Sequence, residues 1–170
     1  MHSILLVIDM QNDFIDGALG TAEAVAIVDN VKRKIESFEG SVWYTRDTHF
    51  ENYMQTREGR YLPIPHCIKE TKGWQITDKL SGLRCDRVID KPTFGSTELQ
   101  TLLAQMQPKH ITLVGLCTDI CVISNAMLLK AALPEAEITV DAACCAGVTP
   151  ESHIRALQAM QLCQIQIENF

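Results

Sequence analysis

Three residue types that could carry out a reaction stand just after predicted strands: a cysteine, an aspartate and a lysine. Cys121 lies in the segment 115–122, between the apolar run 111–114 and a predicted buried helix. At the start of a helix, outward-pointing N–H groups and the macrodipole lower the pKa of a thiol and favour the nucleophilic thiolate. The equally common alternative is a buried cysteine that acts only as a small apolar side chain.

A thiol that attacks a carbonyl also needs a base, a positive charge and donors for the oxyanion. Asp9 follows the first predicted strand and is a candidate base, although a carboxylate there often only caps the next turn. Lys91 follows the third predicted strand and could stabilise both charges, although most lysines are solvated. His2, His110 and His153 have no evident partner and are expected at the surface or as caps, so a Cys–Asp–Lys set is favoured over a Cys–His pair.

The segment 46–73 is too long for an ordinary connection and is expected to be functional or a lid. It contains Asp47, His49, Glu58 and His66. Carboxylates and imidazoles are the ligand set of zinc, manganese and iron, so the segment is a candidate metal site. Alternatively, Asp47 and His49 satisfy the loop backbone and His66 is exposed, because short Asp/His spacings have many false positives.

The elements that must position these side chains are predicted by an alternation of strand-like and helix-like segments. Continuous apolar runs predict buried strands, and apolar residues at helical spacing predict the helices between them. Strands are expected at 4–8, 41–45, 87–90, 111–116, 137–140 and 164–167. Helices are expected at 21–38, 96–106, from the Cys121 segment to about 130, and at 150–162, where Pro150 suits the first turn.

This alternation predicts an α/β protein with a three-layer αβα arrangement and a mostly parallel, doubly wound sheet. The whole chain, 1–170, fits one domain, and the segment at about 46–73 is expected to be its metal and substrate loop. Function collects at the carboxyl ends of the strands in such sheets. Asp9, Asp47, Lys91 and the Cys121 segment all fall just past strand ends, which strengthens each assignment.

Composition narrows the class of protein further. No stretch approaches the roughly 20 apolar residues of a membrane span, and the start of the chain is expected to be a strand rather than a signal peptide. With 15 basic against 21 acidic residues, neither a nucleic-acid nor an anionic membrane partner is expected. Seven cysteines without C-x-x-C spacing indicate free thiols in a reducing, cytoplasmic compartment. The adjacent Cys144 and Cys145 are expected to be structural or incidental.

Three separated motifs resemble those of the isochorismatase-like cysteine hydrolase superfamily, in the same order and over nearly the whole chain. They are D-M-Q-N-D-F at 9–14, K-P-T-F-G-S-T-E-L at 91–99 and G-L-C-T-D-I-C-V at 115–122. The resemblance implies the isochorismatase-like hydrolase fold and a catalytic triad of Cys121, Asp9 and Lys91. It also implies a cis peptide between Leu116 and Cys117, which makes an oxyanion hole of the N–H groups of Cys117 and Cys121.

The motifs are most similar to those of nicotinamidases, which carry a metal site in the region of the long loop. The resemblance implies that Asp47, His49 and His66 bind a divalent metal, with Glu58 as a weaker fourth ligand. Zinc is the expected metal, with manganese and iron as alternatives. The metal would anchor a pyridine nitrogen while Phe14 packs against the ring. The implied reaction is hydrolysis of nicotinamide to nicotinate and ammonia through a thioester, a step of NAD salvage.

The chain departs from the nicotinamidase pattern in two respects. It is short for that group, and a second histidine often found between His49 and His66 is missing, with Arg57 and Arg60 in that stretch instead. The arginines are expected to form ion pairs with nearby acidic residues or with a neighbouring subunit. The alternative is that they bind an anionic substrate. Other family hydrolases, acting on an enol ether or on a ureido or carbamoyl amide, are therefore alternatives. A zinc hydrolase using metal-bound water and a non-catalytic binding protein rank lower. A small amide is the expected partner, and a homo-oligomer is implied by the family.

Overall fold

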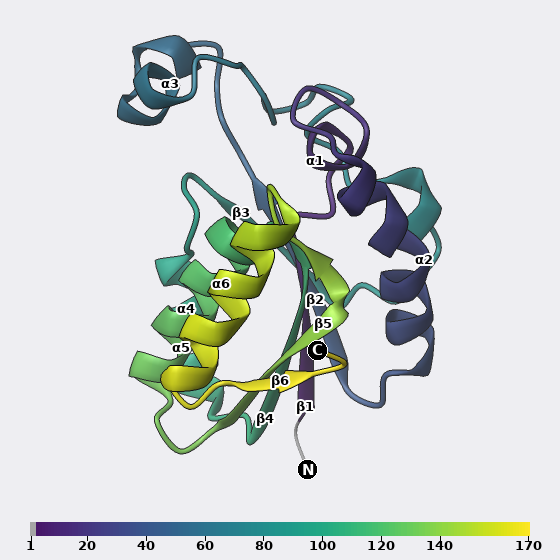
Figure 1. The fold of residues 1–170 in the computed structure, drawn as a ribbon, viewed down its shortest axis with the longest axis vertical. Coiled ribbons are helices and arrows are strands. Elements are labelled where there is room, and N and C mark those ends of the chain that lie inside the picture. Colours follow the sequence, from purple (N-terminus) through teal and green to yellow (C-terminus); the bar gives the residue numbers. More distant parts are fainter. Residues whose placement is uncertain (1–2) are drawn as a thin grey trace.

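A computed structural model describes residues 3–170 and places six strands in one sheet between two layers of helices (Figure 1). The strands are β1 (Ser3–Ile8), β2 (Ser41–Asp47), β3 (Arg87–Lys91), β4 (His110–Leu116), β5 (Glu137–Ala146) and β6 (Gln166–Glu168). Their order is β3-β2-β1-β4-β5-β6, and every neighbouring pair is parallel. The predicted three-layer αβα fold with a doubly wound parallel sheet is confirmed. The prediction for His2 lies outside the described residues.

Six α-helices of this described part surround the sheet and its upper edge. They are α1 (Asn12–Ile15), α2 (Ala22–Ser37), α3 (Arg57–Tyr61), α4 (Thr97–Met106), α5 (Ile123–Ala132) and α6 (Pro150–Leu162). The helices α4, α5 and α6 cover one face and α2 covers the other, and each face has its own buried apolar cluster (Figure 1). Within residues 3–170, no helix is long and apolar enough to span a bilayer.

The helix boundaries follow from local capping. The Thr21 side chain accepts a hydrogen bond from the Ala24 N–H and starts α2 where the apolar spacing predicts it. Thr149 and Ser152 form a reciprocal capping box at the start of α6, and Pro150 occupies the first turn. These helices are therefore positioned by side chains within a few residues of their ends.

Three strand predictions differ from the structure by two residues or more, and one of them is the strand expected at 41–45, which continues to Asp47. The strand expected at 137–140 continues to Ala146, because the small alanines and cysteines that follow are mostly buried in the sheet. The last strand begins at Gln166 rather than Gln164, because Gln164 has a positive φ of 64° and turns the chain there. Small residues and single left-handed residues leave little periodicity for a sequence pattern to detect.

The strand order reverses between β1 and β4, and this reversal locates the site. The chain runs outward from β1 to β2 and β3, returns to β4 beside β1, and then continues outward to β5 and β6. In open α/β sheets, ligands bind outside the carboxyl ends of the strands at such a switch point. The segment that follows β2 and carries α3 projects beyond this edge of the sheet (Figure 1).

Candidate active site

Asp9, Lys91 and Cys121 meet at the carboxyl ends of β1, β3 and β4. The Lys91 Nζ lies 2.6 Å from the Asp9 Oδ2 and 3.5 Å from the Cys121 Sγ. It also donates a hydrogen bond of 3.1 Å to the Thr93 carbonyl. Relative exposures of 0% for Asp9, 1% for Lys91 and 4% for Cys121 place all three out of bulk water. The structure thus brings together three residues that lie far apart in the sequence, and Lys91 is not the solvated lysine of the alternative interpretation.

Thr45 orients the Asp9 carboxylate. The Thr45 hydroxyl donates a hydrogen bond of 2.6 Å to the Asp9 Oδ1 and accepts one of 3.2 Å from the Asp9 N–H. Asp9 itself has a φ of 48°, in the left-handed region that non-glycine residues rarely adopt. Such residues persist where the surroundings fix them, and they cluster at functional sites.

Burial dominates the electrostatics of this cluster. Burial raises the pKa of the Cys121 thiol well above its ordinary value; the Asp9 charge adds to this and Lys91 only partly opposes it. Burial also raises the pKa of Asp9 against the opposing charge of Lys91, which makes the carboxylate a stronger base. For Lys91, burial alone would lower the pKa, but the negative charge of Asp9 raises it and keeps the ammonium protonated.

The expectation that a helix start lowers the Cys121 pKa is therefore wrong. The α-helix begins only at Ile123, and Cys121 lies in a preceding π-helical turn over Thr118–Val122. The macrodipole is a weak, local effect, whereas complete burial removes the thiol from water. The peptide bond between Leu116 and Cys117 is cis, as the resemblance implied.

A second cluster contains the four candidate metal ligands Asp47, His49, Glu58 and His66. One ligand atom from each lies within 4.8 Å of all the others. The His49 Nε2 is 2.9 Å from the Asp47 Oδ2 and 3.5 Å from the Glu58 Oε1. The His66 Nε2 is 3.5 Å from the Asp47 Oδ2 and 3.7 Å from the Glu58 Oε1. His66 is buried, which excludes the alternative that it is exposed.

The chemistry of this donor set fits a divalent cation. Two imidazole nitrogens and two carboxylates converge on one small volume, as zinc, manganese or iron requires. The His66 Nδ1 lies 2.8 Å from the Ile64 carbonyl oxygen, which leaves the Nε2 lone pair for a metal. Burial alone would lower the pKa of His49, but hydrogen bonds with Asp47 and Glu58 raise it to about 9.

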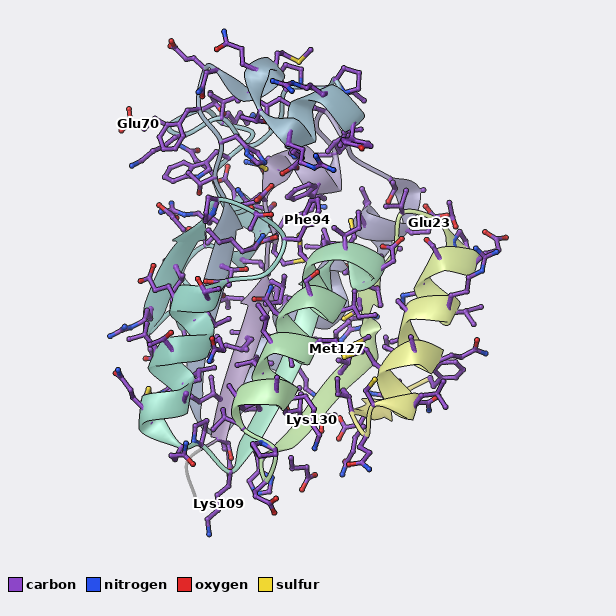
Figure 2. The ribbon with its side chains drawn as sticks, turned by 90° about the vertical axis from the view of Figure 1, so that its left-hand side faces the viewer. Glu23, Glu70, Phe94, Lys109, Met127 and Lys130 are labelled. Carbon is purple, nitrogen blue, oxygen red and sulfur yellow. The ribbon has the colours of Figure 1, made fainter. Side chains whose placement is uncertain are left out.

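The two clusters open into the same cavity, of about 60 Å³. Its lining consists of Phe14, Leu19, Asp47, Glu58, Leu62, His66, Phe94, Cys117, Ile120 and Cys121. An outer hollow of about 460 Å³ shares Glu58, Leu62, Phe94 and Ile120 with it and adds Arg57, Tyr61 and Thr93. Figure 2 shows Phe94 just below the segment that carries α3. A small molecule entering through the outer hollow would meet the thiol and the metal ligands together.

Phe14 and the two arginines take different places around this cavity. Phe14, on α1, is buried with its ring centroid 5.6 Å from that of His66, so it can form a wall for a ring. The Arg57 guanidinium lies over the Tyr61 ring, 5.4 Å from its centroid, at the outer hollow. Arg60 donates a hydrogen bond of 3.2 Å to the Gln55 carbonyl and does not belong to the lining of the cavity or of the outer hollow.

The sequence did not identify the residues whose side chains hold the backbone at or beside the candidate metal ligands. The metal-ligand segment, residues 47–74, carries the four candidate metal ligands. Gln11 and Asp13 belong to a recognised motif and form hydrogen bonds to this segment. The only sequence signal for these bonds is a run of polar side chains after a strand. His153 was expected to have no partner, and this is wrong: its Nδ1 lies 2.7 Å from the Thr118 Oγ1 in the π-helical turn. His110 is partly exposed at the opposite end of β4, as expected, but it also has a partner, because its Nδ1 lies 3.4 Å from the Glu137 Oε2.

The doubly wound sheet and the buried polar side chains at its switch point define an α/β protein with a small cavity lined by reactive groups. The family model described as the Isochorismatase domain matches residues 3–168, and the chain therefore belongs to the isochorismatase family of hydrolases.

Relatives within this family include amide hydrolases. The pyrazinamidase of Pyrococcus horikoshii, whose structure was solved in complex with zinc, superposes with a TM-score of 0.84 at 29% identity and covers 100% of both chains. The nicotinamidase/pyrazinamidase of Mycobacterium tuberculosis is 25% identical over 183 residues, covering 96% of each sequence. The N-carbamoylsarcosine amidase of Thermoplasma acidophilum superposes with a TM-score of 0.80 at 25% identity, covering 99% of this chain and 96% of that one.

Proposed function

We propose that this protein is a cysteine-dependent amidase that hydrolyses nicotinamide to nicotinate and ammonia. The observation that carries the proposal is the shared cavity, which is lined by Cys121 and by the metal ligands Asp47, Glu58 and His66. A ring carboxamide has two ends to bind, a ring nitrogen and a carbonyl carbon, and the cavity offers one cluster for each. The similarity to nicotinamidases and pyrazinamidases supports the same substrate class.

The proposed chemistry begins at the thiol. Asp9 takes the Cys121 proton while the Lys91 ammonium stabilises the charges, and the thiolate attacks the amide carbon. The N–H groups of Cys117 and Cys121 hold the tetrahedral oxyanion, and each such donor typically lowers the barrier by about 3 kcal/mol. Asp9 then protonates the leaving ammonia. Water hydrolyses the thioester to release the acid and the thiol.

The second cluster serves binding and orientation. Asp47, His49, Glu58 and His66 would hold a divalent cation, and the zinc found with the Pyrococcus relative favours zinc. When bound, such a cation supplies a Lewis acid for the ring nitrogen of the substrate. Phe14 lines the cavity beside His66 and would pack against the ring of the substrate.

The setting of the proposed reaction is a reducing compartment. All seven cysteines are free, and five of them, including Cys121, are shielded from solvent to some degree. An active thiol must stay reduced to act as a nucleophile. These free thiols support a cytoplasmic location.

A carbamoyl amide is the second candidate substrate. Arg57 stands at the outer hollow, where its positive charge could pair with the carboxylate of an N-carbamoyl amino acid. The similarity to an N-carbamoylsarcosine amidase gives this alternative independent support. The same thiol chemistry would apply, because the carbonyl under attack again carries an amino leaving group.

Ammonia release from nicotinamide, compared between the wild type and Cys121→Ala, tests the thiol mechanism. We expect turnover to fall at least about a thousandfold, because loss of a nucleophile removes the covalent route. Metal content should be unchanged, since Cys121 is not among the four ligands. Activity that survives Cys121→Ala would favour a metal-bound water as the nucleophile.

His49→Ala, with His110→Ala as a matched control, tests the metal site and the substrate separately. We expect near-stoichiometric zinc in the wild type and in the control, whose imidazole lies at the far end of β4, and its loss in His49→Ala. If His49→Ala loses zinc but the wild type does not turn over nicotinamide, the site stands and the substrate is wrong. N-carbamoyl amino acids are then assayed with the same proteins.

A further inference from the structure

The base of the metal-ligand segment, where its two ends at Asp47 and Trp74 come together, is held by a single buried glutamine. Gln11 is fully buried, and its Oε1 accepts a hydrogen bond of 2.7 Å from the Asp47 N–H. Its Nε2 donates two hydrogen bonds of 2.8 Å, one to the Asp47 carbonyl and one to the Trp74 carbonyl. One side chain therefore fixes the backbone of a metal ligand and ties the two ends of the segment together.

Asp13 holds the same segment from its other side. The Asp13 Oδ2 accepts a hydrogen bond of 2.7 Å from the N–H of Cys67, the residue next to the ligand His66. The segment then passes directly over this carboxylate, because a Cβ added at Gly73 would lie only 2.1 Å from the Asp13 Oδ2. The Asp13 N–H also donates a hydrogen bond of 3.0 Å to the Gly73 carbonyl.

The residue between them makes a peripheral contact that touches no ligand. The Asn12 Nδ2 donates a hydrogen bond of 2.8 Å to the Lys72 carbonyl at an exposed position. Further contacts strengthen the base itself: the Arg46 guanidinium lies 3.7 Å from the centroid of the Trp74 ring, and the Trp74 Nε1 donates to the Thr48 Oγ1 at 2.8 Å. At this base, Gln11 bonds directly to the backbone of the candidate ligand Asp47, and Asp13 bonds to the N–H of Cys67, the residue next to the candidate ligand His66.

We propose that Gln11 and Asp13 are positioning residues of the metal site: Gln11 fixes Asp47, and Asp13 fixes His66 through the Cys67 N–H. This inference rests on the proposed metal site. Ligands must be held close to an ideal geometry, and loss of outer partners typically weakens metal affinity about 10–100-fold. Neither side chain would touch the cation itself, so each acts through a ligand.

Zinc affinity of the apo-protein, measured by competition with a chromogenic chelator, tests the proposal. We expect Gln11→Met and Asp13→Ala each to weaken zinc binding about 10–100-fold. Asp13→Asn retains an oxygen that can accept from the Cys67 N–H, and it should recover most of the affinity. The zinc-free proteins serve for unfolding measurements in urea, which separate a loss of stability from a loss of affinity.

Two amide-to-alanine changes are the matched controls. Asn12→Ala breaks the hydrogen bond to Lys72 within the same motif, and Asn30→Ala breaks a 2.7 Å hydrogen bond to the Ala143 carbonyl far from the site. Both should lower stability slightly and keep zinc affinity within about twofold of the wild type, because neither contact reaches a ligand.

The possible outcomes separate this inference from the proposed function. If the wild type binds zinc but folded Gln11→Met and Asp13→Ala bind it as tightly, the positioning roles are wrong while the metal site stands. If Asn30→Ala loses as much affinity as they do, the effect is one of general stability and the proposal is overturned. If Gln11→Met does not fold, the zinc affinities of Asp13→Ala and Asp13→Asn test the proposal. Equal affinities of these two variants would overturn it. A wild type that binds no zinc overturns the inference and the metal site together.

Discussion

Asp9 illustrates how a single residue meets both a chemical and a conformational demand. Its carboxylate lies 2.6 Å from the Lys91 Nζ, and Thr45 fixes one oxygen with a hydrogen bond. Its φ of 48° belongs to the left-handed region, which asparagine and aspartate tolerate better than other non-glycine residues. A substitution that tests the base must therefore preserve both shape and backbone preference.

Asp9→Asn meets that condition. We expect it to lower kcat for ammonia release about 10²–10⁴-fold, because an amide cannot accept the thiol proton. Zinc content should remain that of the wild type, since Asp9 is not one of the four proposed ligands. Asp16→Asn, which neutralises an exposed carboxylate nearby, is the control and should leave kcat unchanged. A kcat for Asp9→Asn close to that of the wild type would remove Asp9 from the role of base.

Single residues also show where sequence reasoning succeeds and where it fails. Placement after a strand was enough to nominate Asp9, Lys91 and Cys121, because strand ends of a parallel sheet meet at one edge. It gave no indication of Gln11, whose partners lie 36 and 63 residues away. The shift of the Cys121 pKa was predicted in the wrong direction, since a helix start is visible in the sequence and complete burial is not.

At the scale of elements, β4 and the turn that follows it depend on close backbone packing. Gly115 has a φ of 114°, and a Cβ added there would lie 2.1 Å from the Ile8 carbonyl oxygen on β1. β4 can thus approach β1 closely just before the chain turns into Thr118–Val122. The sequence predicted β4 and α5 but not this π-helical turn, because no simple residue period identifies such a turn.

Gly115→Ala, compared with Gly82→Ala, separates close packing from backbone conformation. Gly82 has a φ of 76° with nothing within 4 Å of an added Cβ, so its substitution should cost only about 1–2 kcal/mol of conformational strain. Gly115→Ala adds a backbone clash and should lower the free energy of unfolding by at least about 3 kcal/mol. Urea unfolding of both variants measures the difference. Equal losses would show that β1 and β4 move apart at little cost.

At the scale of the whole molecule, the site is a product of the topology. The alternation of apolar runs and helical spacing was sufficient to predict the layers and the parallel sheet, because crossover helices force neighbouring strands into parallel pairs. The order of the strands and the length of β5 needed the structure. The structure also shows a junction between distant parts of the chain at Asp141 on β5. Asn169 donates a hydrogen bond of 2.9 Å to the Asp141 carboxylate, and Lys34 on α2 pairs with the same carboxylate at 2.8 Å.

This junction predicts an acid-sensitive component of stability. Burial alone would raise the pKa of Asp141, but hydrogen bonds from Asn169 and Lys34 hold it below its ordinary value of 3.8. The folded state therefore favours the charged form, and the contribution to stability is present above about pH 4 and is lost as the pH falls through the folded pKa. Asp141→Asn should lower the free energy of unfolding by about 1–3 kcal/mol at neutral pH, and by progressively less below about pH 4.

Urea unfolding at a series of pH values, with the exposed Glu135→Gln as control, checks this expectation. The control should follow the wild type throughout. A difference between Asp141→Asn and the wild type that is constant with pH would assign the effect to packing rather than to charge.

The central place of β1 has a consequence for the order in which a new chain can assemble. Ser3 pairs with His110, so one edge of β1 has no partner until β4 has been synthesised. At about 5–20 residues per second, this interval lasts about 5–20 s. During this interval, one edge of the strand formed by Ile4 to Ile8 remains unpaired. These five residues are fully buried in the folded protein, and an unpaired apolar strand edge is a template for pairing with other chains. The strand that leads to Asp9 is thus open to pairing with other chains for as long as β4 is missing.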